Sequence, residues 1–274
     1  MTRINEELIK SDFDKIKSGG LDGYHPTSKP ENTDGGHGNT FEKLFRVDEN
    51  NLKKPDYLNF EIKAKAIFDN KKSNITLSSR APDFPPTCGV YLRDRYGHIK
   101  PEDGLKRLYA TLRGVDSSKK SAWTHVHVTK THVPEDKKFY MKIQLFEDEK
   151  KMKILIKDYN FKSINDEIYW TFDSIEEWIG KIKDQVIGIC SDKKIINDLP
   201  HFYYDRAHVF WGLRFDKFIE HIKLGNIVFD FRYGVYKEEH RRGKLHDRGS
   251  CLRLKESEWL ETCKDLYSEY LCID

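Results

Sequence analysis

Three side chains in the first quarter of the sequence could act together on a phosphodiester bond. Asp56, Glu61 and Lys63 lie close together in the segment PDYLNFEIK, residues 55–63. Two carboxylates offer the hard oxygen ligands that Mg²⁺ prefers, and Mn²⁺ is expected to substitute for it. The ammonium group of Lys63 can orient a water molecule, help to deprotonate it, or neutralise charge that builds up on a phosphorane. These residue types at this spacing predict the active centre of a metal-dependent nuclease.

A β-strand is expected to hold two of these groups in place. Apolar and charged side chains alternate along it, with Phe60, Ile62 and Ala64 on one side and Glu61, Lys63 and Lys65 on the other. Glu61 and Lys63 would then share a face, roughly 6.6 Å apart along the strand. Pro55 has no N–H group to donate, so Asp56 is expected at the start of this strand or on the preceding edge. The same alternation is also typical of a solvated strand edge, where charged side chains simply face water.

Glu42 lies upstream in the segment GHGNTFEKLF and has two interpretations. With Asn39 as the N-cap of a short helix, Glu42 falls at the third helical position and could close a capping box. It could also supply a third carboxylate to the active centre. The sequence does not separate these two roles.

Residues 237–248 form a second candidate site. The run holds five basic residues, three acidic residues and two histidines: Lys237, Arg241, Arg242, Lys244 and Arg248, then Glu238, Glu239 and Asp247, then His240 and His246. Apolar side chains alternate on both flanks, which predicts the projecting end of a β-hairpin over residues 227–254. A two-stranded ribbon fits the major groove of DNA, where Arg and Lys pair with guanine and Asp accepts from cytosine. A solvated turn is the alternative, and the net charge of +3 is too small to decide between them.

The chain resembles the MvaI/BcnI-type restriction endonucleases, which are relatives of the mismatch-repair nickase MutH within the PD-(D/E)XK nuclease superfamily. The resemblance covers most of the chain and rests on four blocks in order: GNTFE at 38–42, PDYLNFEIK at 55–63, YWTFDSI at 169–175, and DFRYGVY followed by GKLHDRGSCLRL at 230–254. It implies an α/β fold in which helices flank a mixed sheet and two lobes surround a DNA cleft. It also implies that Asp56 and Glu61 bind the metal, that Lys63 assists the attacking water, and that Glu42 supports the site.

The same resemblance implies which residues contact DNA and what the chain does to it. The expected contacts are Arg232, Lys244, His246, Asp247 and Arg248. Where the family has His-Asp-His, this chain has His246, Asp247 and Arg248, so its target sequence can differ. The implied activity is type II cleavage of double-stranded DNA at a short pseudo-palindromic site such as CC-x-GG, by a monomer whose host DNA a partner methyltransferase protects. A MutH-like nickase and a catalytically inactive DNA-binding module are the alternatives.

The remaining pattern predicts the organisation of the chain. Residues 1–120 are expected to form the catalytic lobe and residues 121–274 the recognition lobe, with the boundary at the soft segment SSKK. Residues 4–17 are expected to be an amphipathic helix that buries Leu8, Ile9, Phe13 and Ile16. Ser73–Arg80 is expected to be a strand beside the active strand, Leu105–Leu112 a helix, and residues 139–157 a hairpin.

Composition predicts a cytosolic protein, and the family resemblance implies a prokaryotic host. No segment approaches the ~18 apolar residues that a membrane span needs, and the N-terminus does not resemble a signal peptide. The five cysteines are odd in number and include no C-x-x-C pair, so they are expected to be plain thiols.

Overall fold

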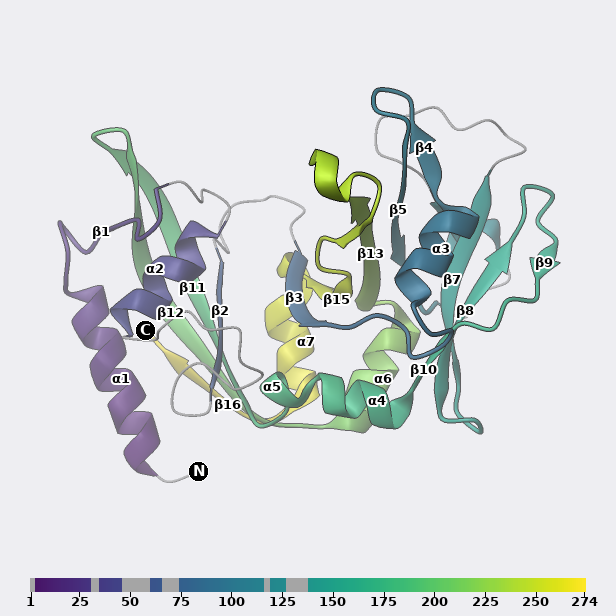
Figure 1. Ribbon diagram of the computed structural model, residues 1–274. Helices are drawn as coiled ribbons and strands as arrows, with labels where there is room; N and C mark the ends of the chain where they lie inside the picture. The colour runs from purple at the N-terminus through teal and green to yellow at the C-terminus, as the bar shows by residue number, and fades with distance from the viewer. Residues whose placement is uncertain (1–2, 31–34, 46–59, 66–73, 116–118, 127–137) are drawn as a thin grey trace. The chain divides into compact units, whose positions relative to one another are not determined.

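The computed structural model describes residues 3–30, 35–45, 60–65, 74–115, 119–126 and 138–274 (Figure 1). The chain divides into two compact units. Unit 1 comprises Met1–Ser73, Gly180–Arg214 and Glu256–Asp274, and unit 2 comprises Asn74–Ile179 and Phe215–Lys255.

Unit 1 is built on a five-stranded sheet. The strand order is β1-β12-β11-β2, and β16 also pairs with the long strand β12. The strands are β1 (His25–Pro26), β2 (Glu61–Lys65), β11 (Gln185–Ile196), β12 (Leu199–Leu213) and β16 (Tyr267–Ile273). Strand β2 runs parallel to β11, while the other pairs are antiparallel. Among the described residues, the predicted active strand is therefore the last strand of this sheet on the β11 side.

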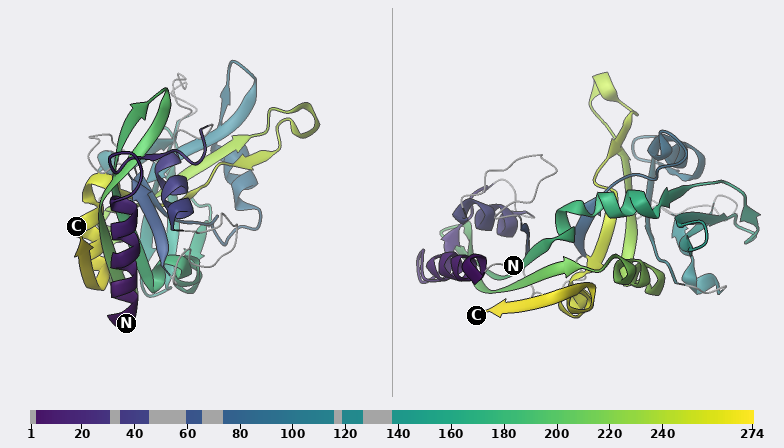
Figure 2. Two further views of the ribbon diagram at one scale, coloured as in Figure 1. Left: turned by 90° about the vertical axis from the view of Figure 1, so that its left-hand side faces the viewer. Right: turned by 90° about the horizontal axis from the view of Figure 1, so that it is seen from below.

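Helices cover both faces of the unit 1 sheet. Helices α1 (Arg3–Lys17) and α2 (Gly36–Leu44) lie side by side and share one apolar core with the strands (Figure 2). The opposite face carries α7 (Trp259–Leu266), preceded by the 3₁₀ turn η4 (Glu256–Glu258), and the short helix α5 (Gly180–Lys183) is attached to the start of β11. The amphipathic helix predicted at residues 4–17 is confirmed, with Ile9, Phe13 and Ile16 buried, but Leu8 is 41% exposed.

Unit 2 contains two further sheets. One has the order β3-β15-β13-β5-β4 with β14 on β13, and the other has the order β10-β8-β7-β6 with β9 on β8. The strands of the first are β3 (Asn74–Ser79), β4 (His98–Lys100), β5 (Leu105–Leu112), β13 (Ile227–Val235), β14 (Leu245–Asp247) and β15 (Cys251–Lys255). Those of the second are β6 (Thr124–Val126), β7 (Phe139–Phe146), β8 (Lys151–Lys157), β9 (Ser163–Ile164) and β10 (Tyr169–Thr171). Trp170 of the second sheet packs against Phe229 of the first, with ring centroids 4.7 Å apart.

Helical segments complete unit 2. They are α3 (Cys88–Tyr96), α4 (Phe172–Trp178), α6 (Phe215–Leu224), η1 (Lys120–Ala122) and η3 (Glu239–Arg241). Helix α4 begins after Thr171, whose side chain accepts a hydrogen bond from the backbone N–H of Ser174.

Two local predictions in unit 2 are wrong and one is confirmed. Leu105–Leu112 is a strand rather than a helix, because it is hydrogen-bonded between β4 and β13 and buries Leu108, Ala110 and Leu112 at period two. The strand predicted at Ser73–Arg80 exists as β3, but it pairs with β15 and not with the active strand. The hairpin predicted over residues 139–157 is confirmed by β7 and β8.

The division into units differs from the predicted boundary near residue 120. Successive segments 1–73, 74–179, 180–214, 215–255 and 256–274 alternate between unit 1 and unit 2. The physical reason is strand pairing, because β2 completes its sheet with β11, β12 and β16 from the second half of the chain.

Two predictions from composition concern membrane-spanning segments and the cysteines. Within the described ranges, no helix is both long and apolar enough to cross a membrane. All five cysteines are free thiols, as predicted.

Candidate active site

Glu61 and Lys63 form a direct ion pair on strand β2. Lys63 Nζ donates a hydrogen bond to Glu61 Oε1 over 2.6 Å. The side chain of Glu61 is 9% exposed and that of Lys63 is 19% exposed. The prediction that these two residues share a strand face is confirmed, and their burial excludes the solvated strand edge that the sequence also allowed.

The packing of β2 explains why this pair lies where it does. Phe60 and Ile62 are buried in the core formed with α1 and α2, so the intervening Glu61 and Lys63 point to the opposite face. Strand β11 pairs with β2 in register, with Val186 opposite Glu61 and Gly188 opposite Lys63. Neighbouring positions of a parallel pair share a face, so the face of the ion pair is also the face on which α7 packs.

The second carboxylate oxygen of Glu61 lies inside the protein. Oε2 is buried and accepts no hydrogen bond from any described residue. Lys181 Nζ of α5 forms an ion pair with this atom at 3.9 Å. A buried carboxylate oxygen without a hydrogen-bond donor is suited to a cation, because leaving it unpaired is costly.

The donors for a metal ion are only partly within the described structure. Among the residues that the structure describes, no three His, Cys, Asp or Glu side chains come together as metal ligands. Asp56, the second expected ligand, lies outside those residues. The described half of the site, a carboxylate with one buried oxygen that accepts no hydrogen bond from described residues, offers the hard oxygen ligand that a divalent cation prefers.

Tyr267 lies next to the carboxylate of Glu61 on the same side of the sheet. Its hydroxyl donates a hydrogen bond to the backbone carbonyl of Ile182 over 2.8 Å. Burial raises the pKa of Tyr267 well above its usual range, and the nearby Cys263 and Glu61 raise it further. The phenol therefore stays protonated and anchors the turn that carries Lys181.

Glu42 lies in the middle of α2, and the capping-box interpretation is wrong. The helix begins at Gly36 with Gly35 as its N-cap, and Asn39 already donates its backbone N–H to the carbonyl of Gly35. Burial raises the pKa of Tyr204, and the carboxylate of Glu42 raises it further. The structure thus brings Glu61 and Lys63 together, while Glu42 lies on the helix that packs against the other face of β2.

His37 fixes the first turn of α2, a contact that the sequence pattern did not indicate. Its Nδ1 lies 2.6 Å from Ser191 Oγ, at the position where the β11 ladder shifts register. The hydroxyl of Tyr204 donates to the carbonyl of His37 over 2.9 Å. These bonds tie the helix that carries Glu42 to strands β11 and β12.

The predicted hairpin over residues 227–254 is confirmed in unit 2. Strand β13 pairs with β14 and β15, and the loop after β13 projects from the unit (Figure 2). Gly234 is opposite His246 in the register, so Arg232, Gly234 and His246 share one face of the hairpin. Arg232, Lys244, Asp247 and Arg248 are exposed, and His246 is half-buried.

A buried carboxylate holds Arg232. Its Nε donates to Asp230 Oδ2 over 2.7 Å, and Asp230 is only 4% exposed. Thr111 donates a hydrogen bond to Asp230 Oδ1. Arg253 forms an ion pair with Asp230 Oδ2 at 3.0 Å. Asp230 therefore orients the guanidinium of Arg232, although the arginine side chain is 46% exposed.

His246 is held by aromatic stacking. Its ring lies 4.3 Å from that of Tyr236, with only 2° between the planes. The guanidinium of Arg241 lies 4.0 Å from the centre of the same tyrosine ring. Arg241, Tyr236 and His246 form what we call the hairpin stack.

Asp247 and Arg248 have different local roles. Asp247 Oδ1 accepts hydrogen bonds from the backbone N–H groups of Gly249 and Ser250, so one of its oxygens closes the turn. The backbone N–H of Arg248 donates to the carbonyl of Arg232. A Cβ atom at Gly234 would lie 3.0 Å from Arg248 Nε, so the arginine side chain crosses the hairpin over this glycine.

Comparison with known proteins shows the family to which the chain belongs. The family model of the MvaI/BcnI restriction endonuclease family matches residues 12–262. The chain belongs to the MvaI/BcnI restriction endonuclease family. As a member of this family it is a site-specific endonuclease, and the family resemblance read from the sequence is confirmed.

Solved structures of MvaI share the fold of this MvaI/BcnI family member. The restriction endonuclease MvaI in complex with its cognate DNA substrate is 26% identical, with 98% of each chain covered and a TM-score of 0.77. MvaI in the absence of DNA is 27% identical, covering 98% of this chain and 97% of that chain with a TM-score of 0.58. No curated protein matches the sequence.

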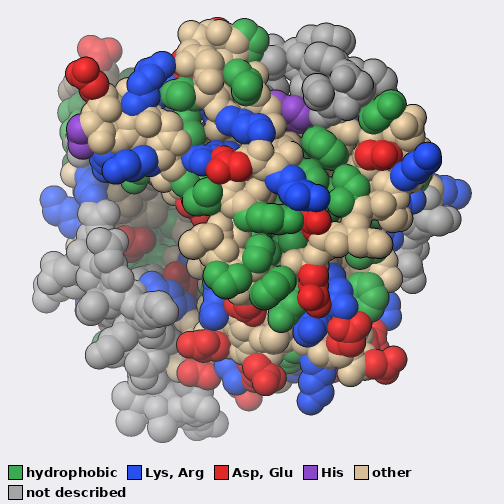
Figure 3. Space-filling model, turned by 45° about the vertical axis from the view of Figure 1, so that its right-hand side comes forward, with side chains coloured by type: hydrophobic (Ala, Val, Ile, Leu, Met, Phe, Trp, Pro, Cys, Tyr) green, Lys and Arg blue, Asp and Glu red, His purple; other side chains and the backbone are tan. Residues whose placement is uncertain are grey.

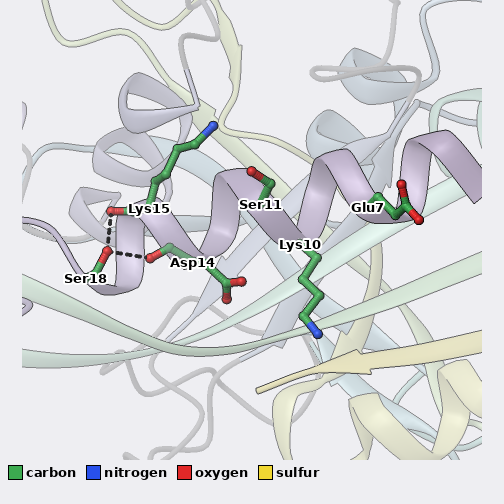
Figure 4. A pocket seen from close by; sticks show the side chains of 6 residues that line it. All are labelled: Glu7, Lys10, Ser11, Asp14, Lys15 and Ser18. Carbon is green, nitrogen blue, oxygen red and sulfur yellow. Dashed lines mark hydrogen bonds between the residues drawn. The ribbon is translucent and has the colours of Figure 1, made fainter.

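A hollow along α1 is lined by residues of that helix and the turn after it, namely Glu7, Lys10, Ser11, Asp14, Lys15 and Ser18 (Figure 4). Ser18 Oγ is bonded to the backbone carbonyl of Asp14 at 2.8 Å, as expected for a helix end. On the face shown in Figure 3, blue and red side chains are interspersed, so positive charge is not gathered there into one patch.

Proposed function

We propose that this endonuclease is a type II enzyme that hydrolyses both strands of duplex DNA at a short G·C-rich pseudo-palindromic site of the CC-x-GG kind. The observation that supports this best is the Glu61–Lys63 pair at 2.6 Å, together with a buried Oε2 that accepts no hydrogen bond from described residues. The cognate DNA substrate of the similar MvaI complex supports DNA as the substrate.

Asp56 and Glu61 would hold Mg²⁺, with Mn²⁺ able to substitute. When bound, such a cation supplies a Lewis acid for the scissile phosphate and lowers the pKa of water. Glu61 suits this role because its Oε2 is buried and accepts no hydrogen bond from described residues. The coordination chemistry of hard oxygen ligands supports Asp56 as the second ligand.

Lys63 would act on the attacking water or on the phosphate itself. Its ammonium group is held by Glu61 and its side chain is 19% exposed, so substrate can reach it. A positive charge fixed in advance stabilises the negative charge that develops on the phosphorane. Glu42 would support the same site from α2, the helix that packs against the other face of β2, through the negative charge of its carboxylate.

The hairpin in unit 2 would read the bases. We assign base contacts to His246, Asp247 and Arg248, and further DNA contacts to Arg232 and Lys244. The second carboxylate oxygen of Asp247 suits cytosine N4, and the arginines suit guanine. In this proposal, unit 1 carries catalysis and unit 2 carries recognition, within a MutH-like PD-(D/E)XK architecture whose two lobes surround the DNA.

The proposal extends to the cellular setting. A monomer would span the short site, and a partner methyltransferase would protect the host DNA without needing to contact the endonuclease. The cytoplasm of a prokaryote is the compartment in which such a pair would act.

Cleavage and binding by single variants test the proposal. In Mg²⁺, Asp56→Ala, Glu61→Ala and Lys63→Ala should each lower plasmid cleavage by several orders of magnitude, while specific DNA binding in Ca²⁺ is largely kept. The roles separate because affinity comes mainly from phosphate and base contacts elsewhere. Near wild-type cleavage by Glu61→Ala would refute the site, and nicking of only one strand would point to a MutH-like nickase.

A further inference from the structure

Lys181 is a second positive group at the active strand. Its Nζ lies 3.9 Å from Glu61 Oε2, while Lys63 Nζ lies 2.6 Å from Oε1 of the same carboxylate. The two ammonium groups therefore contact different oxygens of the Glu61 carboxylate. Lys181 approaches the oxygen that accepts no hydrogen bond from the described residues.

The fold determines the position of Lys181. Helix α5 ends just before β11, and Val186 of β11 is opposite Glu61 in the register. The neighbouring Ile182 is 2% exposed, and its carbonyl accepts the hydrogen bond from Tyr267. The Tyr267 hydrogen bond and the pairing of β11 with β2 hold the backbone of this turn, so Lys181 lies near Glu61 at the start of the active strand.

A cation at this oxygen has opposite effects with and without a bound metal ion. Burying a carboxylate without compensation is costly, so Lys181 stabilises Glu61 while the site holds no metal. A divalent cation at Oε2 would be repelled by a positive charge a few ångströms away. The side chain of Lys181 is 33% exposed, so its flexible end can swing into solvent when a cation binds.

We propose that Lys181 is the counter-ion of Glu61 in the metal-free enzyme and opposes the binding of a divalent cation there. It is a positioning residue that acts through Glu61. This inference rests on the proposed role of Glu61 as a metal ligand, and it assigns to unit 1 a determinant of metal affinity outside the Asp56–Glu61–Lys63 motif.

Binding of Mn²⁺ to the DNA-free protein, followed by electron paramagnetic resonance, tests the inference without using activity. Removing the charge by Lys181→Met should tighten Mn²⁺ binding by roughly threefold or more, since a nearby like charge is lost. Lys181→Arg keeps the charge and should bind Mn²⁺ as the wild type does. Lys183→Met is the matched control, because Lys183 lies on the same short helix, is exposed, and is expected to leave the affinity unchanged.

The melting temperature provides a second readout. In EDTA, Lys181→Met should melt below the wild type because Glu61 loses a partner. Saturating Mn²⁺ should then raise its melting temperature by more than it raises that of the wild type, since a tighter ligand stabilises more. If Lys181→Met does not fold, Lys181→Gln serves the same purpose.

Two outcomes would overturn the inference, and a third would overturn the function on which it rests. Unchanged or weaker Mn²⁺ binding by the folded Lys181→Met variant rejects Lys181 as an opposing charge. Weaker DNA binding without any change in Mn²⁺ affinity makes Lys181 a phosphate contact instead. Glu61→Gln separates the two proposals, because full Mn²⁺ binding by that variant refutes Glu61 as a metal ligand whatever Lys181 does.

Discussion

Gly188 lies directly beneath the indole of Trp259, so close that a Cβ atom there would be 1.7 Å from the ring carbon Cη2. Gly188 is opposite Lys63 in the pairing of β11 with β2, and Trp259 is the first residue of α7. The absence of a side chain at one position therefore sets how closely α7 covers the sheet beside the active strand.

Replacing this glycine tests that relationship. Gly188→Ala should destabilise the protein by ~2 kcal/mol or more, because Trp259 is buried and the added methyl group overpacks the contact. Thermal or urea unfolding measures the change. Gly180→Ala is the control, since a Cβ atom there meets nothing within 4 Å. Equal stability of Gly188→Ala and the wild type would show that α7 can shift at little cost.

Glu42→Gln should lower DNA cleavage at least tenfold with little change in melting temperature. The reason is that α2 begins at Gly36, so Glu42 has no capping role that Gln could preserve, while loss of the negative charge would weaken a supporting carboxylate. Lys43→Gln, an exposed neighbour on the same helix, is the comparison. Wild-type cleavage by Glu42→Gln would remove this residue from the site.

Tyr236→Ala should reduce discrimination at the base pair that His246 reads. The stacked ring at 4.3 Å limits the orientations of the imidazole, and an aromatic pair of this kind contributes ~0.5–1.5 kcal/mol. Tyr236→Phe keeps the ring and should keep the preference. Competition binding against a set of singly substituted duplexes gives the measurement, and unaltered preferences in Tyr236→Ala would make the hairpin stack irrelevant to reading.

Arg248→Ala should relax the preference at one base pair of the mapped site and leave the others intact. A bidentate contact between arginine and guanine contributes roughly 1–3 kcal/mol of discrimination. A phosphate contact would instead weaken binding to all sequences alike and flatten its salt dependence. Cleavage of a panel that varies every position of the site decides between the two, and unchanged relative preferences would eliminate Arg248 as a base reader.

Stability should fall as the pH rises above about 9. Burial raises the pKa of the Cys88 and Cys190 thiols from the usual 9.0 to about 12. The folded state therefore keeps protons that the unfolded chain loses, so this stabilisation is complete below pH 9 and is lost progressively between about pH 9 and 12. Urea unfolding at pH 8, 9 and 10 measures the decline, and Cys88→Ala should make it shallower. A free energy of unfolding that does not change over this pH range would contradict the raised pKa of these thiols.

The local sequence pattern alone was sufficient to predict secondary structure and side-chain orientation where these depend on neighbouring residues. The alternation from Phe60 to Lys63 predicts that Phe60 and Ile62 face the core and that Glu61 and Lys63 share the other face, because strand geometry repeats every two residues whatever the strand pairs with. Period-two alternation also predicts the hairpin around residues 227–254, and helical periodicity predicts the buried face of α1 except at Leu8, which is exposed. The family could likewise be read from its four motif blocks.

Tertiary structure decided everything that depends on strands from distant parts of the chain. Leu105–Leu112 is a strand because β4 and β13 pair with it, which overrides the helical tendency of its leucines, lysine and alanine. The two units alternate along the chain because β11, β12 and β16 complete the sheet of β2. Lys181 carries no local signal at all, since it meets Glu61, 120 positions away in the sequence, only because β11 runs parallel to β2.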